Sequence, residues 1–209
     1  MSDKDKLIKG LEQLGLTLAD AAQQQLLDYL ALLQKWNKVH NLISRKESDN
    51  LVVRHLLDSL VALPYINGSR VVDVGSGAGL PGIPLAIACP QSHFTLLDCN
   101  SKKAGFRNQA VIELGLKNVA VVDARAEEFR PEQGFDSVIS RAFATIADML
   151  TVAGHLAVPG GKFLALKGVY PEQELAELPD GYQLEVVHPL DVPFLGAERH
   201  LAVVTRIKD

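Results

Sequence analysis

The residues with the clearest chemical potential lie in one short loop. Between Asp73 and Gly82 the chain reads DVGSGAGLPG, with Gly75, Gly77 and Gly79 at alternate positions directly after a valine-rich segment. Glycines let the backbone turn sharply and let a ligand lie against main-chain atoms. In an open α/β sheet, ligands bind beyond the carboxyl ends of the strands. We therefore expect a ligand at this loop, with a purely structural turn as the alternative.

The spacing of the glycines indicates which ligand to expect. The dinucleotide fingerprint G-x-G-x-x-G would need a glycine where Leu80 stands, and the Gly-Lys-Ser/Thr of a P-loop is absent from the segment. Asp73 stands two positions before the first glycine, where a carboxylate would repel a pyrophosphate and attract a cation. The loop therefore favours a cationic ligand, such as S-adenosylmethionine with its amino group and sulfonium.

Acidic side chains follow the next two predicted strands. Asp98 ends the second strand, where a carboxylate can accept hydrogen bonds from both ribose hydroxyls. Alternatively, Asp98 only caps the turn before a helix whose expected N-cap is Ser101. After the third strand, residues 123–128 would lie beside an adenine, whose exocyclic amine could donate to Glu127 or Glu128. These two carboxylates could equally be solvated turn residues.

The elements that must position these residues change character near residue 65. Asp20 is the expected N-cap of a first helix, and a second helix is expected from residue 51 until it ends before Pro64. Turn signals at 62–68 separate a helical region, 1–64, from a second domain, 65–209. The first helix is predicted from an amphipathic stripe at Leu26, Leu27, Leu30, Leu33 and Trp36.

From residue 70 onwards, short β-rich segments alternate with helical ones. This alternation is typical of βαβ units with a mostly parallel sheet and helices on both faces. We expect the last two strands to form an antiparallel hairpin at the sheet edge. The predicted helices are 82–88, 101–114 and 145–156, and the predicted strands are 70–74, 93–98, 119–123, 135–140, 162–167, 183–188 and 200–206.

Composition excludes a membrane protein and a disordered chain. The sequence is 47% hydrophobic and 22% charged, and no apolar run reaches the roughly 18 residues that a membrane span needs. The polar N-terminus lacks the apolar core of a signal peptide, so we expect a cytoplasmic protein. Cys89 and Cys99 indicate no disulfide framework, and because no His/Cys cluster has zinc-ligand spacing, no metal is expected.

The distribution of charge is more informative than its sum. The formal net charge of −4 argues weakly against a nucleic-acid partner. Residues 35–55 nevertheless carry five basic side chains, including Lys35, Lys38 and Arg54, against two acidic ones. A local basic face and ordinary solvated charges explain this pattern equally well. A second basic cluster consists of Lys102, Lys103 and Arg107.

Several longer strings are more specific than the glycine loop alone. They are WNK at 36–38 with NL at 41–42, RHLLDS at 54–59, DVGSGAGLPGIP at 73–84, SRAF at 140–143, LKG at 166–168 and ERHL at 198–201. Residues 65–209 resemble class I methyltransferases in general. Over nearly the whole chain, the strings together resemble the ribosomal RNA small subunit methyltransferase G family, also called glucose-inhibited division protein B.

The resemblance implies both a fold and a reaction. The fold would be an α/β, Rossmann-like domain with a mostly parallel seven-stranded sheet and a small N-terminal helical extension. The reaction would transfer a methyl group from S-adenosylmethionine to N7 of a guanosine in the 530 loop of 16S ribosomal RNA. The cofactor contacts that it implies are Gly75, Leu80, Ala126, Glu127 and Arg141, which join Asp73, Gly77, Gly79 and Asp98 from the residue-based reading.

The residues agree with chemistry at a ring nitrogen. Guanine N7 has a free lone pair and no proton to lose, so positioning can supply most of the acceleration without a general base. Residues 140–143 lack the Asp/Asn-Pro-Pro-aromatic motif of many exocyclic-amine methyltransferases, and neither cysteine is placed to attack a base. Arg141 is the expected catalytic residue, where its guanidinium would hold the cofactor carboxylate or an RNA phosphate.

Several residues are expected to contact RNA, each with a structural alternative. Phe143 could stack on a splayed base or belong to the core, and Arg199 with His200 could instead only close the sheet. His55 and Asp58, three positions apart on a helix, could pair with each other, and we favour a structural or docking role for them over a catalytic one. The full set of expected RNA contacts is Lys35, Lys38, Arg54, Phe143, Lys167, Arg199 and His200.

The expected partner is 16S ribosomal RNA or a precursor of the small ribosomal subunit, bound by a monomer without membrane or metal. Two other classes of function remain open at this point. A small-molecule methyltransferase of the same fold would need no RNA, although the basic segment 35–54 speaks against it. A non-catalytic RNA-binding module would bind RNA with steep salt dependence and leave the cofactor unused.

Overall fold

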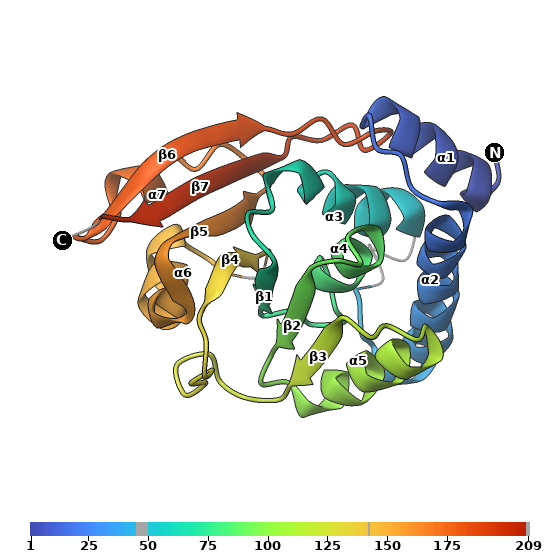
Figure 1. Ribbon diagram of the computed structural model, residues 1–209. Coiled ribbons are helices and arrows are strands. Elements are labelled where there is room, and N and C mark those ends of the chain that lie inside the picture. The colour runs from blue at the N-terminus through green and yellow to red at the C-terminus, as the bar shows by residue number, and fades with distance from the viewer. Residues whose placement is uncertain (45–49, 142, 208–209) are drawn as a thin grey trace.

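The computed structural model describes residues 1–44, 50–141 and 143–207, and in them the chain forms a seven-stranded sheet with the order β3-β2-β1-β4-β5-β7-β6 (Figure 1). The predicted α/β architecture is therefore confirmed. The strands are β1 (Arg70–Val74), β2 (His93–Leu97), β3 (Val119–Val122), β4 (Phe135–Ser140), β5 (Ala157–Lys167), β6 (Tyr182–Pro189) and β7 (His200–Arg206).

Strand directions place the glycine loop at a switch in strand order. β1 pairs in parallel with β2 on one side and with β4 on the other, and β3 and β5 extend the parallel sheet outwards. The chain therefore leaves β1 in one direction and returns to its other side at β4, which opens a crevice above their carboxyl ends. β7 is antiparallel to β5 and to β6, which confirms the predicted hairpin at the edge of the sheet.

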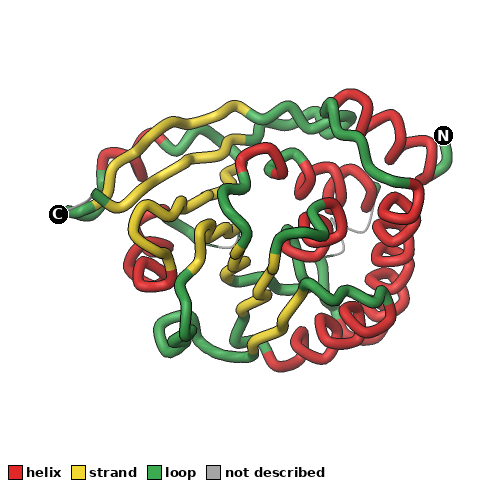
Figure 2. The backbone as a smooth tube through the Cα atoms, in the orientation of Figure 1, coloured by secondary structure: helices red, strands yellow, loops and turns green. Residues whose placement is uncertain are grey.

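Alternating side chains of the strands serve two apolar cores. Val71 and Leu96 pack on the face covered by the N-terminal helices, α4 and α5, whereas Val72 and Leu97 pack on the face covered by α6. Figure 2 shows most helical residues on one side of the strands. The α-helices are α1 (Asp3–Gln13), α2 (Asp20–His40), α3 (Asp58–Leu60), α4 (Gly82–Ala88), α5 (Ser101–Glu113), α6 (Ile146–Ala153) and α7 (Glu172–Ala176), with a π-helical segment at Val52–Leu57 and short 3-10 turns at Leu63–Tyr65 and Gly154–Leu156.

The N-terminal helices share the larger apolar core with the sheet. Leu7 of α1, Leu33 of α2 and Leu56 of the π-helical segment belong to the same buried cluster as Leu96 and Leu201 of the strands. Burying these side chains removes apolar surface from water, and this is the dominant favourable contribution to folding. The helical region 1–64 is thus anchored to the sheet through apolar packing.

Three local predictions were wrong. Asp20 is the first residue of α2 and Ala19 is its N-cap. The N-cap of α5 is Asn100, not Ser101, because the Asn100 side chain accepts a hydrogen bond from the backbone N–H of Lys103. β5 begins at Ala157, five residues before the predicted start, because residues 158–161, which include two glycines, continue the strand. Within the described ranges, no helix is both long and apolar enough to cross a membrane.

Candidate functional site

The glycine loop folds back over the end of β2. The backbone N–H groups of Gly75 and Ser76 both donate to the carbonyl oxygen of Leu97, at 2.8 and 3.2 Å. Gly75, Gly77 and Gly79 have φ angles of +73°, +55° and +88°. Residues with a side chain rarely adopt these angles, so the alternating glycines are what allow the chain to turn tightly after β1. The loop thereby lies at the crevice that the strand order creates.

Asp73 holds the start of α4 from inside the protein. Its Oδ2 accepts a hydrogen bond of 2.7 Å from the backbone N–H of Gly82, and its side chain is 0% exposed. The other oxygen, Oδ1, is buried with no hydrogen-bond partner among the described residues. Burial raises the pKa of Asp73 to about 7, although the Gly82 bond and the charge of Arg141 oppose the shift. Asp73 thus stabilises the end of the glycine loop through a buried hydrogen bond to Gly82.

Arg107 and Asp98 hold the Gly77 peptide from opposite sides. Arg107 is fully buried and donates from NH1 to the Gly77 carbonyl at 2.8 Å and from NH2 to the Asp98 carbonyl at 3.2 Å. The Asp98 carboxylate accepts from the backbone N–H of Gly77 and of Asn100, both at 2.7 Å. Burial lowers the pKa of Arg107, and the charge of Asp98 opposes that shift. Arg107 was grouped with Lys102 and Lys103 by sequence, and its burial excludes it from any basic face that those lysines form.

A residue of the N-terminal region completes this support. Tyr29 of α2 is buried, and its hydroxyl donates to the carbonyl oxygen of Ala78 at 2.8 Å. Burial raises the pKa of the Tyr29 hydroxyl, which therefore remains a proton donor at physiological pH. The glycine loop is thus fixed by β2, α2, α4 and α5 together.

Two cavities meet at Gly75, which lines both. The first has a volume of about 400 Å³ and the second about 260 Å³. The first is lined by Asn41, Leu42, Ile43, Ser44, His55, Gly75, Ser76, Gly77, Ala78, Leu80, Lys103 and Arg141. The second is lined by Val74, Gly75, Leu97, Asp98, Cys99, Ala124, Arg125, Ala126, Glu127, Phe143 and Val152. Every cofactor contact implied by the family resemblance lines one of the two.

The residues at this junction fit a nucleoside joined to an amino acid. Asp98 and Glu127 line the second cavity, where carboxylates suit a ribose and an adenine amine. A carboxylate has about four acceptor positions, so Asp98 retains capacity beyond its two backbone bonds. In the first cavity, the Ser76 hydroxyl is buried with no partner among the described residues, which leaves a polar atom for a ligand. Asp73 and Gly79 do not line these two cavities, so direct ligand contact at either stays a prediction.

Gly79 has a packing role. A Cβ atom at Gly79 would lie 2.4 Å from Cδ1 of Ile83, a distance that real Cβ atoms essentially never show. The positive φ angle and this close approach explain the glycine without a ligand.

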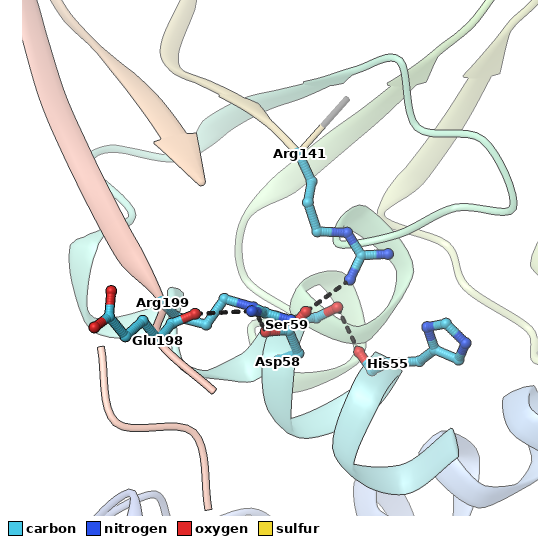
Figure 3. Close-up of polar contacts among 6 residues, drawn as sticks. All are labelled: His55, Asp58, Ser59, Arg141, Glu198 and Arg199. Atoms are coloured by element: carbon cyan, nitrogen blue, oxygen red, sulfur yellow. Dashed lines mark hydrogen bonds and ion pairs between the residues drawn. The ribbon is translucent and has the colours of Figure 1, made fainter. Parts of the chain in front are cut away.

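Arg141, directly after β4, joins the first cavity to a third one. Its NH1 donates to Oδ2 of Asp58 at 3.2 Å, and Nε of Arg199 donates to Oδ1 of the same carboxylate at 2.7 Å (Figure 3). Pairing of Asp58 with His55 was one possibility, but both carboxylate oxygens bind guanidinium groups, and the His55 ring points away from them in Figure 3. Three residues that are distant in sequence therefore form one charged cluster.

The third cavity has a volume of about 310 Å³ and gathers several of the expected RNA contacts. It is lined by Arg54, Asp58, Arg141, Leu166, Lys167, Gly168 and Arg199. Lys167 pairs with Glu174 at 2.7 Å and also donates to the carbonyl oxygen of Ala144 at 3.0 Å. Lys167 therefore supports the segment after β4, and its charge is matched.

The other expected RNA contacts lie elsewhere. Phe143 is half-buried, lines the second cavity and packs against the apolar core beneath α6. Lys35 and Lys38 are exposed on α2 and line a separate cavity with Leu51. His200 packs edge-on against Tyr170, with ring centroids 5.6 Å apart. The structure thus brings together Arg54, Lys167 and Arg199 and separates them from the other four.

Cys89 and Cys99 are both free thiols and form no disulfide with each other. Among the described residues, no group of three or more His, Cys, Asp or Glu side chains could hold a metal ion.

Sequence reasoning missed Tyr29 and Arg107 as parts of the site. The signal for Arg107 was available, since Ala104, Arg107 and Ala110 share one face of the predicted helix at i, i+3 and i+6, and the two alanines are small enough for close packing. Tyr29 offered a weaker signal, as one polar-tipped residue within an apolar stripe.

Comparison with known proteins agrees with this geometry. Residues 22–202 match the family model described as rRNA small subunit methyltransferase G. The ribosomal RNA small subunit methyltransferase G of Aromatoleum aromaticum is 52% identical over 205 residues, which cover 96% of this chain and 97% of the relative. The protein of the same name from Serratia proteamaculans is 52% identical over 200 residues, covering 95% and 97% of the two chains.

Solved structures with lower identity share the fold. The glycopeptide N-methyltransferase MtfA, complexed with S-adenosylmethionine, is 12% identical with a TM-score of 0.64 over 74% of this chain and 88% of its own. TrmN from Thermus thermophilus is 22% identical with a TM-score of 0.55 over 71% of this chain and 47% of its own. The fold is that of class I methyltransferases, and the family match over most of the sequence shows that the chain belongs to the rRNA small subunit methyltransferase G family.

Proposed function

We propose that this protein transfers the methyl group of S-adenosylmethionine to N7 of a guanosine in the 530 loop of 16S ribosomal RNA. Membership of the family supports methylation of small-subunit RNA, and the paired cavities at Gly75 support the donor. The N7 position and the 530 loop come from the family, and the site chemistry is compatible with them.

The observation that carries the proposal is the position of Arg141. This residue lines the first cavity beside the glycine loop and also the third cavity beside Arg54 and Arg199. A guanidinium at that junction can bind an anionic group of the donor or of the RNA, with donors in a fixed planar arrangement. The site therefore places a small-molecule cavity directly beside a cationic one.

The residues of this chain contribute binding and orientation. When bound, the donor supplies a methyl group on a positively charged sulfur. Asp98 and Glu127 would hold the nucleoside in the second cavity, and Ser76 with the Gly77 backbone would line the amino-acid end in the first. Because guanine N7 carries a lone pair and loses no proton, the site needs no general base for the transfer. Orientation of two reactants can supply effective molarities of roughly 10⁵–10⁸ M.

We further propose that the enzyme works as a monomer in the cytoplasm, with 16S RNA or a small-subunit precursor as its partner. The free cysteines agree with a reducing compartment.

The test is transfer of labelled methyl groups into small-subunit RNA from cells that lack the enzyme, followed by mapping of the modified nucleotide. We expect one modified guanosine in the 530 loop, absent when RNA from wild-type cells is the substrate. No incorporation into naked RNA or into any subunit particle would contradict the proposal. A labelled product of low mass formed without RNA would favour a small-molecule methyltransferase instead.

A further inference from the structure

The third cavity differs from the two beside the glycine loop in its charge. Four of its seven lining residues are basic: Arg54, Arg141, Lys167 and Arg199. Among the described residues that line it, Asp58 is the one acidic side chain. The charge of Lys167 is matched by Glu174, so the remaining three cations and Asp58 give the cavity a net charge of +2. A site of this charge favours an anion.

Asp58 fixes the directions of two of these cations. Its side chain is only 6% exposed, and its two oxygens bind different guanidinium groups, NH1 of Arg141 and Nε of Arg199. Arg199 is held further by a bond of 2.8 Å from NH1 to the carbonyl oxygen of Glu198. Each guanidinium has five N–H donors, so these bonds leave others for a ligand. The cations are therefore ordered before anything binds.

Another part of the lining is accessible. Arg54 is exposed and forms no ion pair with any residue in the described ranges. A Cβ atom at Gly168 would meet nothing within 4 Å, so this edge of the cavity is open. A chain with a regularly spaced anionic backbone could therefore approach between Arg54 and Arg199 and continue past Gly168.

We propose that this cavity binds one backbone phosphate of the RNA strand next to the target guanosine, with Asp58 as the positioning residue that presents Arg141 and Arg199. This inference rests on the proposed function. A phosphodiester carries one negative charge and matches the planar donors of arginine. Because Arg141 also lines the first cavity, a phosphate held here would set the distance between the target base and the methyl donor.

The test compares three variants in binding and methylation of small-subunit RNA over a range of salt concentrations. Arg54→Gln removes an exposed cation that has no ion pair among the described residues, and Arg54→Gln/Arg199→Gln removes two of the cavity's cations. Arg206→Gln, which neutralises an exposed arginine at the other end of β7, is the matched control. Thermal unfolding and affinity for S-adenosylhomocysteine are measured on each variant.

We expect the Arg54→Gln variant to raise KM for RNA several-fold and the double variant to raise it further. The slope of log K against log salt should become shallower by about 0.7 in the double variant, the value for one phosphate contact on a single strand. Affinity for S-adenosylhomocysteine should stay within twofold, and Arg206→Gln should match the wild type throughout.

Two outcomes overturn the inference and one separates it from the proposed function. If Arg54→Gln and the folded double variant behave like Arg206→Gln, no phosphate is bound in the cavity. An unchanged salt slope with weaker cofactor binding would assign the cavity to the cofactor. If wild-type protein methylates no RNA, the proposed function itself fails, and this inference fails with it.

Discussion

Arg141 donates to Asp58 at 3.2 Å, and this contact links the end of β4 to the N-terminal helical region across 83 positions of sequence. Asp58 also holds Arg199 at 2.7 Å, so the start of β7 joins the same cluster. The N-terminal region is therefore part of the site, because it supplies the carboxylate that orients the cations of the cleft.

Replacement of Asp58 by asparagine should lower turnover without weakening RNA binding. An asparagine keeps the shape but has one acceptor, so it releases a guanidinium group and leaves the cavity more positive. We expect kcat to fall about tenfold while KM for RNA stays equal or decreases. Glu185→Gln, which breaks a separate ion pair with Lys162, is the control. Turnover within twofold of the wild type would show that Asp58 does not position the cations.

Replacement of Arg107 by methionine should weaken both the fold and cofactor binding. The variant keeps an unbranched side chain but loses the bonds to the carbonyls of Gly77 and Asp98. Hydrogen bonds from charged groups contribute about 1.5–3 kcal/mol each, so we expect a loss of about 2 kcal/mol or more in the free energy of unfolding. Calorimetry should show at least tenfold weaker binding of S-adenosylhomocysteine. Lys117→Met, at an exposed position, should change neither quantity.

The buried carboxyl group of Asp73 should make stability depend on pH. Its pKa is raised from 3.8 to about 7 in the folded protein, so the folded state keeps a proton that the unfolded chain releases. The free energy of unfolding should therefore decrease as pH rises from about 4 to about 7, with a slope of up to about 1.4 kcal/mol per pH unit. Asp73→Asn does not titrate and should lack this component. Denaturant unfolding at several pH values measures the difference, and parallel curves for both proteins would contradict it.

The sheet was predictable because each strand is a short valine-, leucine- or phenylalanine-containing run bounded by turn residues. All seven predicted strands are present, although β5 begins five residues before its predicted start, and the short runs that alternate with helices suffice to indicate parallel pairing. The N-cap of α5 was less predictable, because asparagine and serine are both good N-caps and stand side by side at Asn100 and Ser101. Which of them caps the helix depends on the preceding turn, in which the Asp98 carboxylate accepts a hydrogen bond from the backbone N–H of Asn100.

The position of the glycine loop was predictable from local sequence, whereas the cluster of Asp58, Arg141 and Arg199 was not. Gly75 and Asp98 lie within or next to short motifs, so their spacing predicts their place, whereas Leu80 was added by the family resemblance. The Asp58 carboxylate meets partners 83 and 141 positions away, and no helical periodicity carries that information. Local sequence suggests only His55 as a partner for Asp58, whereas the fold supplies two arginines that form charge-assisted hydrogen bonds with it.

Replacement of Tyr29 by phenylalanine should show that α2 supports the glycine loop. The change removes the hydrogen bond to the Ala78 carbonyl and leaves that oxygen without its partner. We expect a decrease of about 1–3 kcal/mol in the free energy of unfolding and a smaller loss of cofactor affinity. Tyr65→Phe is the matched control, because the Tyr65 ring stacks on His188 and that contact is kept. Equal stability of the two variants would show that the Tyr29 hydroxyl adds nothing.

Replacement of Asp98 by alanine should weaken cofactor binding in two separable ways. The variant loses the bond that holds the Gly77 N–H, and it loses the carboxylate that we expect to bind the ribose hydroxyls. We expect S-adenosylhomocysteine to bind at least tenfold more weakly by calorimetry, and the Asp180→Ala variant, changed at an exposed position before β6, to bind it normally.

An analogue of S-adenosylhomocysteine that lacks both ribose hydroxyls separates the two contributions of Asp98. The wild type should bind this analogue more weakly than the parent compound, because the carboxylate loses its hydroxyl partners. The Asp98→Ala variant should bind the two compounds equally, because it has no carboxylate at this position with which the ribose hydroxyls could form hydrogen bonds. If the variant still discriminates between them as strongly as the wild type, Asp98 only supports the loop and another group binds the ribose.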